Sequence, residues 1–291
     1  KAGALEGAGD FVAALLFSPD NARVYGLLIN GHLLTWDLAS GELLTTVRTP
    51  MIATRMPLFW HPATGELVAA IPSIAYTSYV SVDPESGALT LLTLHPGFPT
   101  YGEFRAFQEE RGSRILNDIV AVPFAYSDAT SHLPLVGDEV WTVNAQGQVA
   151  LLSLGSGETQ VLVEGGDRPI LSIRDLTATE GGLVAFAETV EDTLYVIDLV
   201  NEVMSELPIE HDSALLSPDG TQFAQYNEDG TALLLTALED GAVATLALPA
   251  GLGTLRPIMR LRFSPDGAML AVAGLVDASE EGVILLYRMG G

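Results

Sequence analysis

The feature that most constrains this chain is a short turn that recurs at distant points of the sequence. Its clearest copies read Phe-Ser-Pro-Asp at residues 17–20, Leu-Ser-Pro-Asp-Gly at 216–220 and Phe-Ser-Pro-Asp-Gly at 263–267. In such a turn proline fixes φ at the first corner, aspartate accepts hydrogen bonds from nearby amides, and glycine adopts the positive φ that closes it. Weaker copies occur at residues 60–62 and 126–128. Each copy follows an apolar run, and the clearest copies also precede one, so we expect the turn to link two strands.

Two further turns recur in a fixed order within the same unit. One contains Ser-Gly or Asp-Gly, at residues 39–42, 84–87, 155–158 and 239–241, and the other contains Asn followed by Gly, at residues 30–31, 144–147 and 227–230. Three turns joining four short strands, repeated about every 40 to 50 residues, are typical of β-propeller blades. A β-sandwich also uses short strands, but it would not repeat the same turn chemistry in the same order. We therefore predict an all-β fold, a β-propeller of four-stranded antiparallel blades.

The two ends of the chain are expected to share one blade. Predicted blades begin near Phe11, Arg55, Ile119, Ile170, Asp212 and Ile258. The last of them stops after its third strand, at residues 283–289, and residues 2–6 are long enough to supply the fourth. Sharing a blade in this way removes exposed edge strands. We expect the N-terminal strand to close the propeller.

Residues 95–118 do not fit the four-strand pattern, and residues 103–111 have a short helical periodicity. We interpret this segment as an insertion between the second and third blades of a single domain that spans residues 1–291. This interpretation gives six blades. If the segment forms strands of its own, the number of blades becomes seven.

Composition excludes several classes of function. The net charge is −24 and Lys1 is the only lysine, which argues against nucleic acid because phosphate binding needs clustered Lys and Arg. No apolar run is long enough to cross a bilayer, so no membrane-spanning segment is expected. The chain has no cysteine and begins at Lys1 without an initiator Met. We take a removed export signal as one explanation of that start and expect an extracytoplasmic protein, periplasmic, secreted or cell-surface, with the cytoplasm as the alternative.

Two stretches resemble the WD-repeat superfamily. Residues 263–271, Phe-Ser-Pro-Asp-Gly-Ala-Met-Leu-Ala, resemble the start of such a repeat, and residues 34–38, Leu-Thr-Trp-Asp-Leu, resemble its end. Only one predicted blade carries the Trp-Asp pair, so the chain is more similar to divergent bacterial WD-repeat-like propellers, many of which are exported. The resemblance implies a platform that binds other molecules, often proteins, and implies no reaction.

Hairpin tips and inter-blade loops of a propeller emerge on one face, and acidic residues gather in them here. We predict an acidic rim made of Glu188, Glu191, Asp192, Glu228, Asp229, Asp277, Glu280 and Glu281. Such a rim could bind Ca²⁺ or attract a basic partner. The alternative is that these carboxylates only keep the hairpin tips soluble. No EF-hand-type loop strengthens the calcium hypothesis, so no cofactor is otherwise predicted.

The same predicted face carries basic and aromatic residues. Arg55, Arg168 and Arg256 lie at equivalent positions near the expected channel mouth, where they could bind an anionic ligand or pair with the acidic tips. The insertion adds a set of aromatic and arginine side chains, the types that dominate protein-binding hot spots: Phe98, Tyr101, Phe104, Phe107, Arg105 and Arg111. The alternative is that these aromatic side chains pack the insertion onto its own blade.

No motif for nucleophilic, metalloprotease or phosphate-binding chemistry occurs, and the five histidines show no ligand spacing. His61 precedes proline, which favours a capping or solvated role over metal ligation. We therefore predict a non-enzymatic module that binds partner proteins, as a subunit of a larger assembly. The alternative is a lactonase-type propeller hydrolase with a divalent metal in its central channel.

Overall fold

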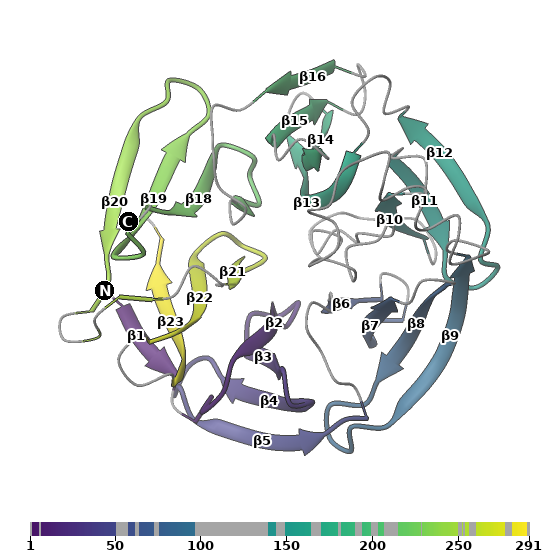
Figure 1. Cartoon of the computed structure of the whole chain (residues 1–291), viewed down its shortest axis with the longest axis horizontal. Helices are drawn as coiled ribbons and strands as arrows, with labels where there is room; N and C mark the ends of the chain where they lie inside the picture. Colours follow the sequence, from purple (N-terminus) through teal and green to yellow (C-terminus); the bar gives the residue numbers. More distant parts are fainter. Residues whose placement is uncertain are drawn as a thin grey trace. The chain divides into compact units, whose positions relative to one another are not determined.

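The structure of the protein is a computed structural model (Figure 1). It describes residues 2–5, 7–50, 58–61, 64–72, 76–96, 139–143, 149–163, 170–179, 182–189, 194–198, 203–206, 215–227, 229–249, 252, 254–255, 260–276 and 281–289. The chain divides into two compact units. The first comprises Lys1–Thr54, Asp83–Ala88 and His211–Gly291, and the second comprises Arg55–Val82 and Leu89–Glu210.

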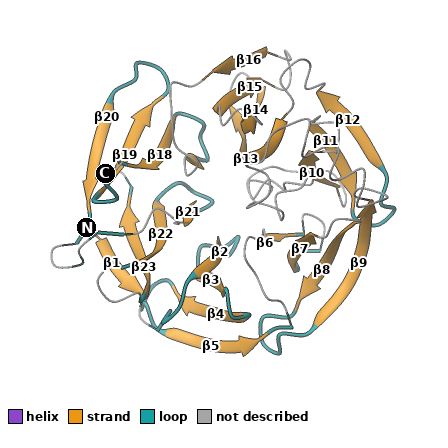
Figure 2. Cartoon of the chain, viewed as in Figure 1, coloured by secondary structure: helices purple, strands orange, loops and turns teal. Residues whose placement is uncertain are grey.

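The regular elements of the described ranges are all β-strands (Figure 2). No helix in these ranges has the length and apolarity needed to cross a membrane.

The first unit holds three four-stranded antiparallel sheets. One contains β2 (Val12–Phe17), β3 (Arg23–Leu28), β4 (His32–Asp37) and β5 (Leu43–Arg48) in chain order. A second contains β17 (Leu215–Leu216), β18 (Gln222–Tyr226), β19 (Ala232–Ala237) and β20 (Val243–Ala247). The third contains β21 (Arg260–Phe263), β22 (Met269–Leu275), β23 (Gly282–Arg288) and β1 (Ala2–Leu5).

The second unit also consists of antiparallel sheets in chain order. Its first sheet contains β6 (Leu58–Trp60), β7 (Leu67–Pro72), β8 (Tyr76–Val82) and β9 (Leu89–Pro96). The next contains β10 (Glu139–Val143), β11 (Val149–Ser153) and β12 (Thr159–Val163). The last contains β13 (Ile170–Thr179), β14 (Gly182–Thr189), β15 (Leu194–Asp198) and β16 (Val203–Glu206).

These sheets confirm the predicted succession of four-stranded antiparallel units. Five of their first strands begin close to predicted blade starts, at Val12, Leu58, Ile170, Leu215 and Arg260. The remaining predicted start, Ile119, lies outside the described residues, as do residues 97–118 of the predicted insertion. His95 and Pro96 belong to β9, so the predicted insertion overlaps this strand at its first two positions.

The N-terminal strand completes the sheet that the C-terminal strands begin, as the sequence predicted. β1 pairs with β23 from Ala2 opposite Tyr287 to Leu5 opposite Ile284. Figure 1 shows this junction where the purple β1 meets the yellow β23. The ends of the chain are therefore held by backbone hydrogen bonds as well as by side-chain packing.

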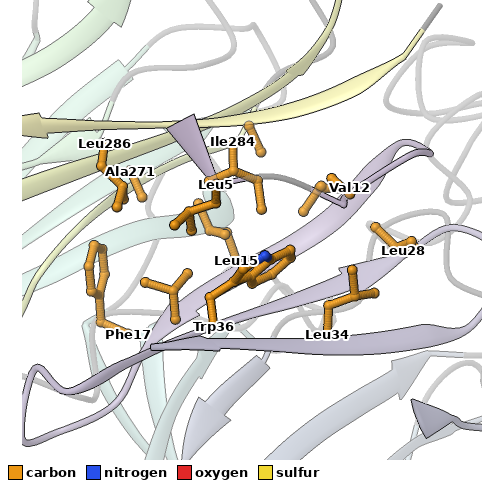
Figure 3. Close-up of a cluster of buried hydrophobic side chains, with 13 residues drawn as sticks. Leu5, Val12, Leu15, Phe17, Leu28, Leu34, Trp36, Ala271, Ile284 and Leu286 are labelled. Atoms are coloured by element: carbon orange, nitrogen blue, oxygen red, sulfur yellow. The ribbon is translucent and has the colours of Figure 1, made fainter. Parts of the chain in front are cut away.

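A shared core joins this sheet to the β2–β5 sheet. Trp36 is fully buried in it, and Leu5, Leu15, Leu34 and Ile284 surround the indole (Figure 3). A Cβ added at Gly26 would lie 2.9 Å from Cζ3 of Trp36, so the glycine leaves room for the ring. The Trp of the Trp-Asp pair is thus a core residue that packs two sheets together.

The recurring Ser-Pro-Asp turn has the same geometry in all three clear copies. The serine is buried, and its Oγ donates to the aspartate Oδ1 at 2.5–2.6 Å in the pairs Ser18–Asp20, Ser217–Asp219 and Ser264–Asp266. The same Oγ accepts a backbone N–H from the next strand, at 2.8 Å from Arg23, 3.1 Å from Gln222 and 2.8 Å from Met269. Each turn is therefore fixed by a buried hydroxyl between two strands.

Two of the Ser-Gly turns, each joining the last two strands of its sheet, lie close to another strand. Gly87 has φ +73°, and a Cβ added there would lie 2.6 Å from the carbonyl oxygen of Arg48, at the end of β5. The equivalent Gly157 approaches Thr93 near the end of β9, and a Cβ there would lie 3.2 Å from Oγ1. Glycine recurs in this turn because the backbone needs a positive φ, and at Gly87 and Gly157 the neighbouring strand also leaves little room.

Candidate functional site

Three connections of the first unit meet along one line of backbone contacts. The β18–β19 turn contacts Leu255, whose N–H donates to the carbonyl of Gly230 at 3.2 Å. Leu255 also forms an antiparallel bridge with Val276, and the N–H of Val276 donates to the carbonyl of Glu281 at 3.0 Å. These contacts hold the β18–β19 turn beside the β22–β23 connection.

The line continues to the segment that precedes β2. The backbone of Gly282 lies so close to Asp10 that a Cβ at this glycine would overlap the Asp10 carbonyl group. The Asp10 carboxylate in turn accepts a hydrogen bond from Asn30 Nδ2 at 2.9 Å, in the β3–β4 turn. We call the polar residues along this line the hairpin rim, defined as Asp10, Asn30, His32, Asp229 and Glu281.

Side-chain hydrogen bonds of an asparagine stabilise both the β18–β19 turn and the β3–β4 turn. Asn227 caps the β18–β19 turn, since its Oδ1 accepts the N–H groups of Thr231 and Ala232, both at 2.9 Å. This cap leaves the side chain of Asp229 exposed at the tip. In the β3–β4 turn, Asn30 Oδ1 accepts the N–H of His32 at 3.1 Å and lies 2.8 Å from its Nδ1. Both tips are ordered by asparagine, and each presents a polar side chain.

The structure brings together two residues of the predicted acidic rim and adds three that the sequence did not reveal. Asp229 and Glu281 belong to the predicted set, and both are exposed. Asp10, Asn30 and His32 join them only because the segment before β2 contacts the start of β23. The Asn-Gly pair at residues 30–31 was recognised as a turn, but no sequence pattern linked it to Asp10.

Glu188 of the predicted acidic rim lies in β14, opposite Ser172 and Leu194, and no described contact joins it to the hairpin rim. The remaining predicted site residues lie outside the described residues. These are Glu191, Asp192, Glu228, Asp277 and Glu280 of the acidic rim, and the three arginines Arg55, Arg168 and Arg256. They also include the predicted partner-binding set of Phe98, Tyr101, Phe104, Phe107, Arg105 and Arg111. Their roles stay predictions.

A second group of carboxylates, at the opposite ends of the strands, has a structural role. The Ser18 hydroxyl, with the Ala22 N–H, lowers the pKa of Asp20, and the equivalent bonds from Ser264 and Ala268 lower the pKa of Asp266. Backbone and hydroxyl hydrogen bonds from Ser40 lower the pKa of Asp37 in the same way. These aspartates are hydrogen-bonded within their own turns, so they differ from the exposed Asp229.

Partial burial alone would raise the pKa of Asp219, but hydrogen bonds from Ser217 and Thr221 outweigh it, and the pKa is lowered overall. Asp219 therefore behaves like the other turn aspartates.

His61 acts as a cap, as the sequence favoured. Its ring is buried, and Nδ1 accepts the N–H of Thr64 at 3.3 Å. Within the described ranges no three His, Asp or Glu side chains are grouped closely enough to hold a metal ion.

The hairpin rim offers carboxylates, an amide and an imidazole on backbone that is tied together across three sheets. Such a set can pair with lysine and arginine side chains and can donate or accept hydrogen bonds at their edges. It lacks a nucleophile paired with a base. The arrangement suits recognition of a basic surface.

Comparison with known proteins identifies the fold. No model of a known protein family matches the chain, and no curated protein sequence matches it. Its structure is similar to the β-propeller domain of Cps50 (Swd1) from Myceliophteria thermophila, with a TM-score of 0.58 and 12% identity over 100% of each chain. This likeness confirms the predicted fold, and the chain is a β-propeller. Because 1342 solved chains match, the fold by itself assigns no partner.

Proposed function

We propose that this chain is a non-enzymatic binding module that recognises a partner protein through the face carrying the hairpin rim. The observation that carries the proposal is the continuous backbone line from Gly230 to Asp10, which brings the connections of three sheets together. Propellers use such clustered tips as recognition surfaces because a rigid scaffold positions them. The likeness to another propeller domain supports a scaffold of this kind.

The charge of the chain favours a basic partner surface. The net charge of −24 attracts such a partner over a long range, and the exposed Asp229 and Glu281 give local complementarity. The predicted insertion at residues 95–118 is expected to emerge on the same face and to add its aromatic side chains to the surface. Membership of a larger assembly and a location outside the cytoplasm belong to the same proposal and rest on the sequence alone.

The proposal is tested with a variant that neutralises the rim, Asp229→Asn with Glu281→Gln. The matched control is Glu42→Gln with Glu85→Gln, which removes the same number of charges from exposed Ser-Gly turns. Proteins captured from the native source by immobilised wild-type chain are compared with those captured by each variant, at low and at high salt. We expect a salt-sensitive partner that the rim variant loses and the control keeps.

Equal capture by both variants would show that the rim does not bind the partner. The insertion is tested separately with Phe104→Ala and Phe107→Ala. Retained assembly by this folded variant would remove the insertion from the proposed surface. No observation on the described residues favours the lactonase-type alternative.

A further inference from the structure

The exposed large hydrophobic side chains of the described residues all lie on the last strands of their sheets, in chain order. Leu43 and Leu44 belong to β5, Leu91 and Leu94 to β9, Val161 to β12 and Val243 to β20. Each of these strands is the edge of its sheet, so it also exposes unpaired backbone N–H and C=O groups. Natural proteins usually guard such edges with lysine, proline, bulges or short length, because an open edge pairs with other chains.

Three of these edges are interrupted by a β-bulge. The register against the neighbouring strand shifts between Thr35 and Trp36 for β5, between Tyr79 and Val80 for β9, and between Val149 and Ala150 for β12. Each shift places one extra residue in the outer strand. A bulge breaks the regular spacing of the exposed backbone groups, so these strands are poor templates for another strand.

The edge of β20 has no such interruption. Its register with β19 is regular from Ala232 opposite Ala247 to Thr236 opposite Val243. The strand reads Val-Ala-Thr-Leu-Ala and carries no charge, and four of its five residues are exposed. Val243 is 58% exposed, the largest value among the exposed hydrophobic side chains. The other regular edges, β1 and β16, have only four residues each.

The hydrogen-bond pattern shows which groups of β20 face outward. The N–H of Ala237 donates to the carbonyl of Ala242 at 2.9 Å, so Ala242 is bonded to the β19 side. Because bonding alternates along an antiparallel pair, Val243, Thr245 and Ala247 direct their N–H and C=O groups away from β19. Tyr287 Oη donates to the Ala247 carbonyl at 3.3 Å, which agrees with this outward direction.

We propose that the β20 edge binds an extended peptide segment by antiparallel strand addition at Val243 and Thr245. Two residues of the partner would form backbone hydrogen bonds with these two positions, and alternate side chains would lie over the apolar strand. An antiparallel partner places its C-terminal end beside the β19–β20 turn, where Glu239 and Asp240 are exposed. The segment is therefore expected to be β-branched or apolar and to end in basic residues.

Charge also favours a basic peptide segment over a second copy of the chain as the partner of the β20 edge. Two copies would bring together proteins of net charge −24 each, whereas a segment with C-terminal lysines complements the turn. The β20 edge does not include any residue of the hairpin rim. The two proposals can therefore fail independently.

The test uses a fluorescent peptide of alternating valine and threonine followed by two lysines, and a matched peptide that ends in two glutamates. We expect the basic peptide to bind the wild-type chain saturably with a Kd below about 1 mM. We expect the acidic peptide to bind about tenfold more weakly or not at all. Backbone amide exchange at Val243 and Thr245 should slow when the basic peptide is present.

Thr245→Pro removes an outward N–H without breaking the bonds to β19, so the sheet should stay intact. We expect it to weaken basic-peptide binding about tenfold or more, because a lost hydrogen bond and a steric block together exceed 1.4 kcal/mol. The matched control is Thr46→Pro, at an exposed, outward-facing position of the bulged β5. This variant should bind the peptide within about twofold of wild type.

Circular dichroism and melting temperature establish that both proline variants are folded. An equal effect of the two variants, or equal binding of the basic and acidic peptides, would overturn the proposal. Sedimentation that shows a dimer abolished by Thr245→Pro, without peptide binding, would mean that a second copy occupies the edge, and it would also overturn the proposal.

Discussion

Replacing Ser264 by alanine removes a hydroxyl that has no access to solvent. Ser264 is 0% exposed, its Oγ donates to Asp266 at 2.6 Å, and it accepts the N–H of Met269 at 2.8 Å. Alanine leaves that N–H without its partner at the start of β22, and a buried unsatisfied donor costs about 1–3 kcal/mol. The Asp266 carboxylate can be rehydrated, so its lost bond adds less. We expect a total loss of about 2–3 kcal/mol in the free energy of unfolding.

Thermal and denaturant unfolding measure this loss. One kcal/mol lowers the melting temperature by about 2–4 °C in a domain of roughly this size, so Ser264→Ala should lower it by about 4–12 °C. Ser40→Ala is the control, because Ser40 makes a similar bond to Asp37 at 2.9 Å but is exposed. Water replaces the lost bond there, and we expect a loss below about 0.5 kcal/mol. If the two variants lose the same free energy of unfolding, burial of the turn serine is not the reason for its contribution to stability.

Three further predictions concern the backbone and the turn carboxylates. Gly87→Ala should destabilise the chain clearly more than Gly241→Ala, because both have positive φ but only Gly87 faces a carbonyl at 2.6 Å; similar melting temperatures would contradict this. Deleting residues 1–7 removes β1 and the buried Leu5. The deletion should lower the melting temperature much more than removal of an unstructured terminus would, and an unchanged melting temperature would exclude closure by β1. The hydrogen-bonded Asp266 has a lowered pKa, so its contribution is present above the unfolded pKa of about 3.9 and is lost as pH falls below it. Asp266→Asn should therefore reduce the acid sensitivity of unfolding, and an unchanged pH profile below about pH 4 would count against this role.

The binding surface could be predicted from the sequence only in part. Charged hairpin tips were recognisable, and Asp229 and Glu281 do lie on connected tips of adjoining sheets. Asp10 was not predicted, because nothing in the residues around it indicates that its carbonyl meets Gly282. Contacts between segments more than 250 residues apart depend on how the sheets are placed, which turn chemistry does not encode.

The sequence by itself determined the turns and hence the fold class. Ser-Pro-Asp, Asn-Gly and Ser-Gly act within a few residues, so their φ preferences and side-chain hydrogen bonds specify local geometry wherever they occur. Asn21, with φ 54°, shows the same rule, since it takes the left-handed position that Gly220 and Gly267 occupy in the other copies. Repetition of these local units in a fixed order was sufficient to predict a propeller.

Only the tertiary structure decided which of these equivalent units differ from one another. It buries Trp36 between two sheets, places Gly87 close to a carbonyl oxygen while a Cβ at the equivalent Gly241 would have no neighbour within 4 Å, and places a bulge in β5 but not in β20. These differences arise from packing between sheets and from the register between strands. Both are long-range properties, because the same short motif meets a different neighbour in each copy.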